Sequence, residues 1–442
     1  MKKKIGFIFE EDYLGSYPSF VESIRILSEQ GFKVDILGTL RESKFPDPPE
    51  FNENVIIDLL PINYPICRDY RTGEDDSKKD NALNAVEDQN HKTFFLKKLV
   101  PRKIKNIARL LISDIKENLR TFKSQKEYFY NKTKYFFFVF KKVKKGKYDI
   151  LIGVDFGGGA AAYLSYLFNP SKKFLYWGLE IMEPYQELWA YRLVKHLEIK
   201  ACQTADAIIS TDKARIEDVC KANRTNAKTK RLLLLPHSPK GFCSKKKSLF
   251  FEKLFSLDDS NIKILHSGWI HEVMCSRELA EVSTSWPQNW RLIFHERMKR
   301  TFDESYIQEV IKAGDKKTLL SLKPVEYDLI DEVVLSADIG IVIYDSYEKY
   351  GTSWISLAKG SGKIAHYLRC GKPVVCKNLP GFKEIIEKYQ CGVMFDNINE
   401  IETAVNKILA NYEFYQKNAY VCYKHEYEFG KFFKKVTSFL KA

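Results

Sequence analysis

The sequence predicts an α/β protein made of two doubly wound domains that face each other across a cleft. Three observations support this fold class. Apolar strands alternate with helices along the first half of the chain, residues 240–260 form a break, and the same alternation restarts at residue 261. This alternation is typical of parallel sheets covered by helices. A chain of 442 residues has room for two or three domains.

In the first half, apolar runs mark the expected strands and helical spacing marks the helices. KIGFIF at residues 4–9 reads as a buried strand. Phe20, Ile24 and Leu27 then recur at helical spacing, and Gly31 closes that helix. Further strands are expected at residues 33–38, 147–155, 172–180, 205–211 and 231–239, with helices after residue 156 and at 188–205.

The second half repeats the pattern, so both domains are predicted to be Rossmann-like. Its strands are expected at residues 261–269, 290–295, 337–344, 372–376 and 391–395, and its helices at 276–282, 303–313, after 361, at 381–389 and from 400 onward. The expected domains are residues 1–245 and 246–420, and residues 421–442 form a helix that could pack back on the first domain. Ligands of such sheets bind beyond the carboxyl ends of the strands.

The positive charge of the chain is concentrated in one insertion of the first domain, at about residues 92–147. This segment has 18 Lys and Arg against 3 Asp and Glu, a net charge of 18 − 3 = +15, whereas the whole chain carries +14. A basic amphipathic helix is expected from Pro101, and KTKYFFFVFKKVKKGK interleaves aromatics with lysines. Two interpretations stay open, a surface helix packed on the domain and contact with anionic lipid. No recognition motif supports nucleic acid as a partner.

Several features bear on the cellular location. No stretch reaches the roughly 18 apolar residues of a membrane span. Glu10, Glu11 and Asp12 interrupt the first apolar run too early for a signal peptide. The nine cysteines are scattered without metal-ligand spacing, which favours a reducing cytosol and no structural zinc. We therefore expect a cytoplasmic protein, peripheral to the inner face of the cell membrane.

The stretch Gly360-Ser361-Gly362-Lys363 precedes a helix pattern and has the composition of a phosphate cradle. A helix N-terminus attracts anions, glycines permit close backbone approach, and Lys363 adds a full charge. The alternative is an ordinary glycine turn with a solvated lysine. The stretch is not a P-loop, because GxxxxGK[ST] is absent.

A wider set of segments resembles the bacterial glycosyltransferases of family 4 and related GT-B glycosyltransferases. SGKIAHYLRCGKPVV at residues 361–375 is similar to their donor-binding segment. The agreement extends in order to four other segments, FLYWGLEIMEPY, LLPHSP, SADIGIVIYD and PGFKEIIEKYQCGVMFD. The resemblance implies the GT-B fold, in which two Rossmann-like domains face a cleft.

The resemblance also implies an activity and its partners. The C-terminal domain would bind a nucleotide-sugar donor, and the N-terminal domain a glycan or lipid-linked acceptor, in cell-surface polysaccharide assembly. The residues that would bind the donor phosphates are Ser361, Gly362, Lys363, Gly268 and Arg277. Positive groups and helix dipoles stabilise a departing anion, so we expect neither a metal nor a cofactor.

The sequence departs from family 4 at its two acids, since Ala358 and His366 stand at the positions of the paired glutamates. His366 could bond a ribose or phosphate, or lie on the helix surface. The stereochemistry therefore stays open. An inverting reaction needs a general base at a strand end of the N-terminal domain, and Asp155 and Glu180 are the candidates.

The loop after the first strand offers acceptor contacts. Asp12, Tyr13 and Ser16 lie in it, and Asp12 is a further candidate for the base.

A dinucleotide-dependent oxidoreductase is the main alternative. Residues 157–162, GGGAAA, fit GxGxxA after a strand, and Glu180 follows about where a ribose-binding acid would lie. A non-catalytic protein that binds lipid or polyanion is a second alternative.

Overall fold

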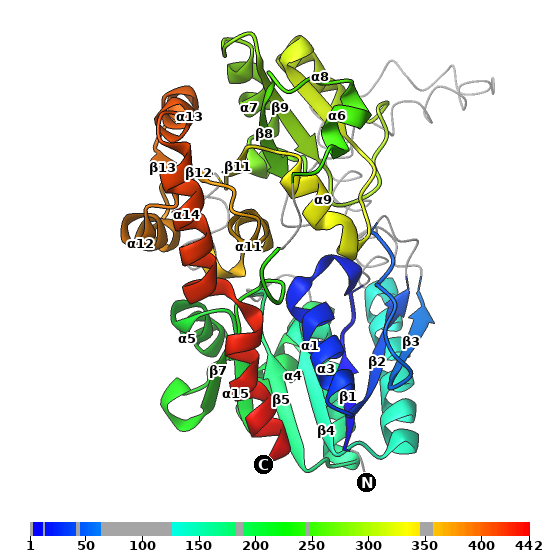
Figure 1. Cartoon of the computed structure of the whole chain (residues 1–442). Helices are drawn as coiled ribbons and strands as arrows, with labels where there is room; N and C mark the ends of the chain where they lie inside the picture. Colours follow the sequence, from blue (N-terminus) through cyan, green and yellow to red (C-terminus); the bar gives the residue numbers. More distant parts are fainter. Residues whose placement is uncertain are drawn as a thin grey trace, which may run out of the picture.

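The structure is a computed structural model that describes residues 3–11, 14–40, 45–62, 126–182, 189–243, 247–344 and 357–442. It contains two parallel sheets, one in each domain (Figure 1). The strand orders are β3-β2-β1-β4-β5-β6-β7 and β10-β9-β8-β11-β12-β13. In each sheet the first strand of the domain lies inside the sheet, with the next strands in sequence on one side and the later strands on the other, as in doubly wound sheets. The predicted pair of α/β domains is confirmed.

The N-terminal domain contains the seven-stranded sheet. Its strands are β1 Lys4–Ile8, β2 Lys33–Leu40, β3 Val55–Pro61, β4 Ile150–Val154, β5 Lys173–Trp177, β6 Ala207–Ser210 and β7 Arg231–Leu234. Its helices are α1 Pro18–Glu29, α3 Asp155–Phe168, α4 Trp189–Thr204 and α5 Lys213–Ala222, and residues 126–146 are also helical. The core strand β4 is buried along its whole length, because helices cover both faces of a parallel sheet.

The C-terminal domain contains the six-stranded sheet. Its strands are β8 Ile262–Ser267, β9 Trp290–His295, β10 Thr318–Ser321, β11 Ile339–Val342, β12 Val374–Lys377 and β13 Gly392–Phe395. Its helices are α6 Phe250–Phe255, α7 Ser276–Ser283, α8 Ser305–Gly314, α9 Ile330–Leu335, α11 Gly362–Arg369, α12 Pro380–Tyr389, α13 Ile401–Leu409 and α14 Tyr412–Cys422.

Five elements are absent from the expectations drawn from the sequence: β3, α5, α6, β10 and α9. Strand β3 forms the edge of its sheet and is half-exposed, so its apolar pattern is weak. Strand β10 has four residues and α9 has six, too few to show a clear period. The helix expected from residue 400 onward is broken into α13, α14, a π-helical turn at Tyr423–Tyr427 and α15.

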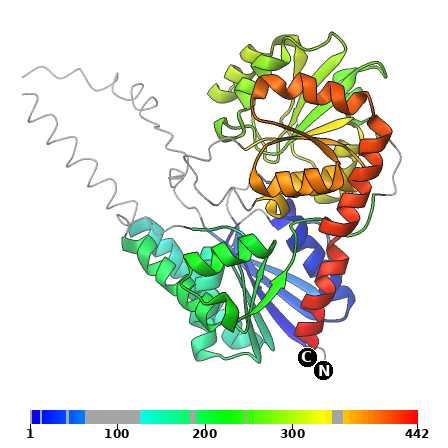
Figure 2. The ribbon, with the colours of Figure 1, turned by 90° about the vertical axis from the view of Figure 1, so that its left-hand side faces the viewer.

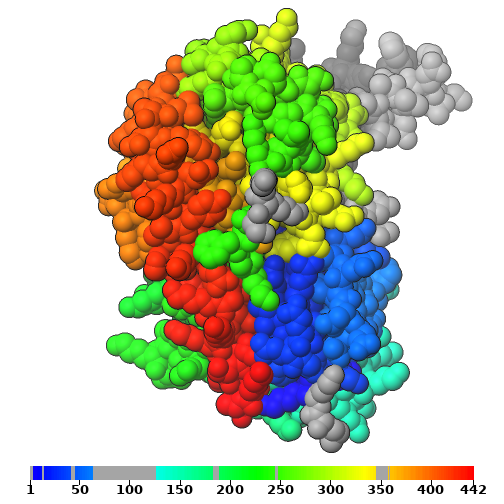
Figure 3. All heavy atoms as spheres, viewed as in Figure 1, coloured from blue at the N-terminus to red at the C-terminus, as the bar shows by residue number. Residues whose placement is uncertain are grey.

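The end of the chain crosses from one domain to the other. Helix α14 packs in the C-terminal domain, whereas α15, Phe429–Lys441, buries its apolar face in the core of the N-terminal domain. Figures 2 and 3 show this segment in red, running from one domain onto the other. The side chain of Glu428 accepts hydrogen bonds from the N–H groups of Gly430 and Lys431 and so caps α15 where it begins.

Polar contacts also join the two domains. The guanidinium of Arg25 on α1 forms two hydrogen bonds, 2.9 and 2.7 Å long, with the carboxylate of Asp328. The hydroxyl of the neighbouring Tyr327 donates to Glu22 over 2.9 Å. No helix within the described ranges has the length and apolarity to cross a membrane.

Candidate active site

Helix α11 begins where the C-terminal domain meets the N-terminal domain. Ser361 precedes it with an extended backbone, at φ −85° and ψ 102°. Its hydroxyl does not cap the helix but forms a 2.8 Å hydrogen bond with the hydroxyl of Tyr344. The first-turn N–H groups therefore receive no capping bond from Ser361, and an anion can take that place.

The tip of α11 faces the start of α1. A Cβ atom at Gly362 would lie 3.1 Å from Cδ2 of His237 and 3.7 Å from Cγ of Pro18. Nδ1 of His237 lies 2.7 Å from the hydroxyl of Ser19. Burial lowers the pKa of His237 to about 3, so this imidazole is neutral near pH 7. The positive ends of two helix dipoles thus converge at the domain interface.

Lys363 directs its ammonium away from the N-terminal domain, toward the turn after β8. Nζ lies 3.4 Å from Nε2 of His266 and 4.8 Å from the ring centre of Tyr344. Within the described ranges, no carboxylate lies in ion-pair distance of this ammonium. Burial, with a smaller contribution from the charge of Arg297, lowers the pKa of Lys363 to about 7. A partly buried ammonium of this kind is suited to binding an anionic ligand.

The turn after β8 brings Gly268 against Lys363. Gly268 has φ +129°, and a Cβ atom there would lie 3.4 Å from both Cε and Nζ of Lys363. The carboxylate of Glu296 holds this turn, because it accepts hydrogen bonds from the N–H groups of Ile270 and Arg297, 2.9 and 2.8 Å long. Burial raises the pKa of Glu296 to about 7. Two residues that the sequence assigned to the donor site from separate motifs thus lie side by side.

Arg297 is a site residue that the sequence reasoning missed. It follows β9 and is exposed, and its guanidinium lies 5.7 Å from the ring centres of Trp269 and Phe45. Phe45 belongs to the N-terminal domain, so Arg297 lies where the domains meet. Its charge lowers the pKa of both Lys363 and His237, although burial is the larger cause for each. In the sequence, Arg297 could have been found from the basic stretch that directly follows the strand WRLIFH.

Two predicted donor-binding residues lie apart from this group. Arg277 is exposed on α7, and its backbone N–H donates to the hydroxyl of Tyr306 over 3.4 Å. His366 is buried on α11, where Nδ1 lies 3.9 Å from Oδ1 of Asp331 and the ring lies against Tyr327. The donor roles of Arg277 and His366 stay predictions.

Asp155 and Glu180 lie next to each other at the carboxyl ends of β4 and β5. Oδ1 of Asp155 accepts hydrogen bonds from the N–H groups of Leu179 and Glu180, 2.6 and 3.0 Å long. Arg215 donates to the carbonyl of Leu179 from the other side and lies 3.8 Å from the Glu180 carboxylate. Asp155 is the first residue of α3, and its side chain braces the turn that presents Glu180.

The two carboxylates have different environments. Asp155 is 8% exposed, and burial, followed by the charge of Glu180, raises its pKa to about 8. The Glu180 side chain is 40% exposed, and its charge acts on the pKa of Tyr344 in the opposite domain. Of the two predicted bases, Glu180 is therefore the more exposed one and lies toward the domain interface.

Part of the predicted acceptor loop lies outside the described residues, namely Asp12 and Tyr13. Ser16 is described and ends the short 3₁₀ helix Leu14–Ser16, directly before α1. Its hydroxyl is buried and has no hydrogen-bond partner among the described residues. The acceptor role of this loop stays a prediction.

The glycine run after β4 is used for packing inside α3. A Cβ atom at Gly157 would lie 1.4 Å from Oε2 of Glu10, and one at Gly158 would lie 2.4 Å from the carbonyl oxygen of Ile8. Glu10 in turn pairs with the buried ammonium of Lys132. These glycines let α3 approach β1 and leave no space there for a pyrophosphate, which removes the sequence basis for a dinucleotide site.

Comparisons with known proteins agree with this architecture. Residues 325–438 match the family described as Glucosyltransferase 3-like, C-terminal domain. No curated protein sequence matches the chain. Sucrose-phosphate synthase from Thermosynechococcus elongatus has a similar structure, with a TM-score of 0.60 and 12% identity over 100% of this chain and 98% of that one.

Two further solved structures share the fold. HepE from Anabaena, solved in complex with UDP-glucose, has a TM-score of 0.61 and 11% identity over 99% of each chain. WaaG, a glycosyltransferase involved in lipopolysaccharide biosynthesis, has a TM-score of 0.55 and 12% identity over 98% of each chain. Membership of family 4 itself stays a prediction. The chain has the GT-B fold, and its C-terminal domain matches a glucosyltransferase family, so the prediction of a GT-B glycosyltransferase is confirmed.

Proposed function

We propose that this chain transfers a sugar from a nucleoside-diphosphate sugar to a glycan or lipid-linked acceptor, in the assembly of cell-surface polysaccharide. The observation that carries the proposal is the contact of Lys363 with the Gly268 turn, beside Arg297 and the N-terminus of α11. Two cations and a helix N-terminus at one place suit two linked phosphates. The HepE complexes with UDP and UDP-glucose make uridine diphosphate the first nucleotide to test.

The same groups would stabilise the leaving group. When the bond between sugar and phosphate breaks, negative charge grows on the diphosphate, and cations fixed beside it lower the barrier. Lys363 and Arg297 would provide this charge from α11 and from the end of β9. We propose that the transfer needs neither a divalent metal nor an organic cofactor.

Glu180 would act on the acceptor. It is presented at the carboxyl end of β5 by its own turn, whose N–H groups donate to Asp155 and whose Leu179 carbonyl accepts from Arg215. A partly exposed carboxylate in this position can accept the proton of an acceptor hydroxyl as that oxygen attacks the sugar. This step would belong to an inverting transfer.

An anionic membrane surface would hold the acceptor near the site. Helix 126–146 exposes Tyr130 and Phe137, each 57% accessible, beside Lys134 and Lys141. The two ammonium groups lie 4.4 and 4.3 Å from the centres of these rings. Aromatic and cationic side chains in one stripe suit the boundary between lipid headgroups and acyl chains.

The stripe formed by Tyr130, Lys134, Phe137 and Lys141 begins at the same edge of the sheet as Glu180, the proposed base. Lys132, on the inner face of this helix, lies 5.6 Å from the ring centre of Phe156, directly after β4. Glu180 follows the neighbouring strand β5. A lipid-linked acceptor bound at the stripe would therefore have its headgroup near this edge.

A panel of UDP, GDP, dTDP and NAD(H) in a thermal-shift assay tests the proposal. We expect one nucleoside diphosphate to raise the melting temperature, with the same shift when Mg²⁺ is added, and no shift with NAD(H). Lys363→Ala should lose the shift. Lys383→Ala is the matched control, because Lys383 is an exposed lysine on α12 of the same domain. An unchanged shift in Lys363→Ala would contradict the proposed site.

A further inference from the structure

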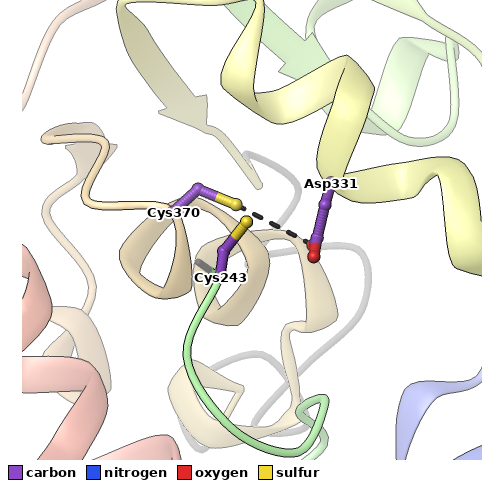
Figure 4. Close-up of side chains that lie close together, drawn as sticks. All are labelled: Cys243, Asp331 and Cys370. Atoms are coloured by element: carbon purple, nitrogen blue, oxygen red, sulfur yellow. Dashed lines mark hydrogen bonds between the residues drawn. The ribbon is translucent and has the colours of Figure 1, made fainter. Parts of the chain in front are cut away.

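Two cysteines and an aspartate meet where the interdomain connection touches the C-terminal domain (Figure 4). Cys243 lies in the connection, Cys370 directly follows α11, and Asp331 is on α9. The two Sγ atoms and a carboxylate oxygen all lie within 4.8 Å of one another. Sγ of Cys370 is 3.8 Å from Oδ1 of Asp331. This is the only such group of metal-ligating side chains within the described ranges.

A fourth ligand-forming side chain borders this group. Nδ1 of His366 lies 3.9 Å from Oδ1 of Asp331, and it is buried with no hydrogen-bond partner among the residues that the structure describes. His366 and Cys370 are four residues apart, so they lie on the same side of α11. The histidine is 7% exposed, and an unpaired polar atom at that depth calls for a ligand.

The spacing of these atoms is close to that of a zinc site. Zinc in structural sites is tetrahedral, with bonds of about 2.3 Å to sulfur and about 2.0–2.2 Å to nitrogen or oxygen. Such bonds place neighbouring ligand atoms roughly 3.3–3.8 Å apart. The 3.8 Å between Cys370 and Asp331 falls in that range, and the remaining atoms of the group, within 4.8 Å of one another, would have to move closer on binding the ion.

The charges at the site also balance. Arg369 donates to both oxygens of Asp331 over 2.8 and 2.7 Å, so this pair is neutral. Binding of Zn²⁺ would release one proton from each thiol, and two thiolates would offset the charge of the ion. The site would stay neutral, with Arg369 orienting the carboxylate from behind.

We propose that Cys243, Cys370 and Asp331 bind a zinc ion, with Nδ1 of His366 in the fourth position. Thiolate and imidazole together select zinc over the oxygen-binding cations Mg²⁺ and Ca²⁺. The proposal departs from the expectation of no structural zinc, which rested on sequence spacing. The ligands come from three separate segments, at residues 243, 331 and 366–370, so no local motif announces them.

The ion would tie the interdomain connection to the helix that begins at the donor site. Nε of Arg369 already donates to the carbonyl of Gly241 over 2.9 Å. With Cys243 bound as well, residues 241–243 would move with α9 and α11. If the domains rotate, the connection would then bend on the N-terminal side of Gly241. Gly241 has φ +70°, and no described atom lies within 4 Å of its Cβ position.

Metal content of the purified full-length chain tests the site. After dialysis against metal-free buffer, we expect about one zinc per chain by mass spectrometry. Cys243→Ser and Cys370→Ser should each lose it. Cobalt should give the thiolate charge-transfer band and the visible bands of tetrahedral Co²⁺, and Cys243→Ser should abolish both.

Cys220→Ser is the matched control. Cys202 and Cys220 are also close enough to interact, yet among the described residues they belong to no group of three metal-ligating side chains. This variant should keep its zinc. Zinc-free wild-type protein, a disulfide between Cys243 and Cys370, or zinc retained in Cys243→Ser would each overturn the proposal. The nucleotide thermal shift is read separately, so failure of the zinc site and failure of the donor site are distinguishable.

Discussion

The ammonium of Lys363 lies 3.4 Å from the point that a Cβ atom of Gly268 would occupy. The two residues are contributed by α11 and by the turn after β8, on neighbouring parts of one sheet edge. A glycine is favoured at this turn by its positive φ, and a Cβ atom there would be in van der Waals contact with Lys363.

Gly268→Ala should therefore weaken nucleotide binding. The methyl group would strain the backbone by about 1–3 kcal/mol and crowd the ammonium. We expect the affinity for UDP to fall about tenfold, which corresponds to roughly 1.4 kcal/mol, measured by calorimetry. Gly241→Ala is the control, because Gly241 also has positive φ but nothing within 4 Å of its Cβ position. Equal loss of UDP affinity in both variants would show that only backbone strain matters.

Nucleotide affinity should depend on pH through Lys363. The pKa of its ammonium is lowered to about 7, so the free protein loses this charge as the pH rises through 7. Binding a diphosphate favours the charged form, and affinity should fall from pH 7 to 9, by up to about tenfold per pH unit. The phosphates, with a second pKa of about 6, keep a constant charge in that range. In Lys363→Arg the side chain stays charged, so nucleotide affinity should be constant from pH 7 to 9. If the affinity of this variant still falls with pH, Lys363 is not the cause of the pH dependence.

The two carboxylates at β4 and β5 should respond differently to substitution. Glu180→Gln should lower the transfer rate by about 10²- to 10⁴-fold at unchanged UDP affinity, because it removes a general base and leaves the donor site intact. Glu387→Gln, an exposed acid on α12, is the control. Full activity of Glu180→Gln with the proposed acceptor would exclude it as the base.

Asp155 should act through its hydrogen bonds. Asp155→Asn keeps an oxygen that accepts from the N–H groups of Leu179 and Glu180. Asp155→Ala removes that oxygen, and we expect the free energy of unfolding to fall by about 1–3 kcal/mol for each N–H group that loses its acceptor. Burial raises the pKa of Asp155 to about 8, above that of the unfolded chain. The native state then holds a proton that the unfolded state has lost, so this residue's contribution to stability should fall from about pH 4 to pH 8. Urea unfolding should show this slope in the wild type and a smaller one in Asp155→Asn.

The aromatic and basic stripe predicts binding to anionic vesicles. Lys134→Ala with Lys141→Ala should weaken sedimentation with phosphatidylglycerol vesicles by about 2 kcal/mol, roughly 30-fold, at about 1 kcal/mol for each lysine. A double variant of exposed lysines on the other domain, Lys383→Ala with Lys407→Ala, should bind normally. If both double variants bind alike, the stripe is not the membrane contact.

The sequence alone determined the alternation of strands and helices, the division into two domains and the start of α11. These features follow from local chemistry, since periodic burial and glycine placement act over a few residues. It also predicted Lys363, from the glycine-bearing helix start, and Gly268, from the resemblance to GT-B glycosyltransferases. Elements without such a pattern, the half-exposed β3 and the four-residue β10, escaped detection.

Only the tertiary structure decided which side chains share a site. Arg297 joins Lys363 because β9 and α11 reach the same edge of one sheet, although about 65 residues separate them. Asp155, a predicted base, is instead buried and hydrogen-bonded to the turn after the next strand. The space beside the glycines of α3 is occupied by the side chain of Glu10. Sheet order and helix packing fix these distances, and both depend on contacts between segments far apart in the chain.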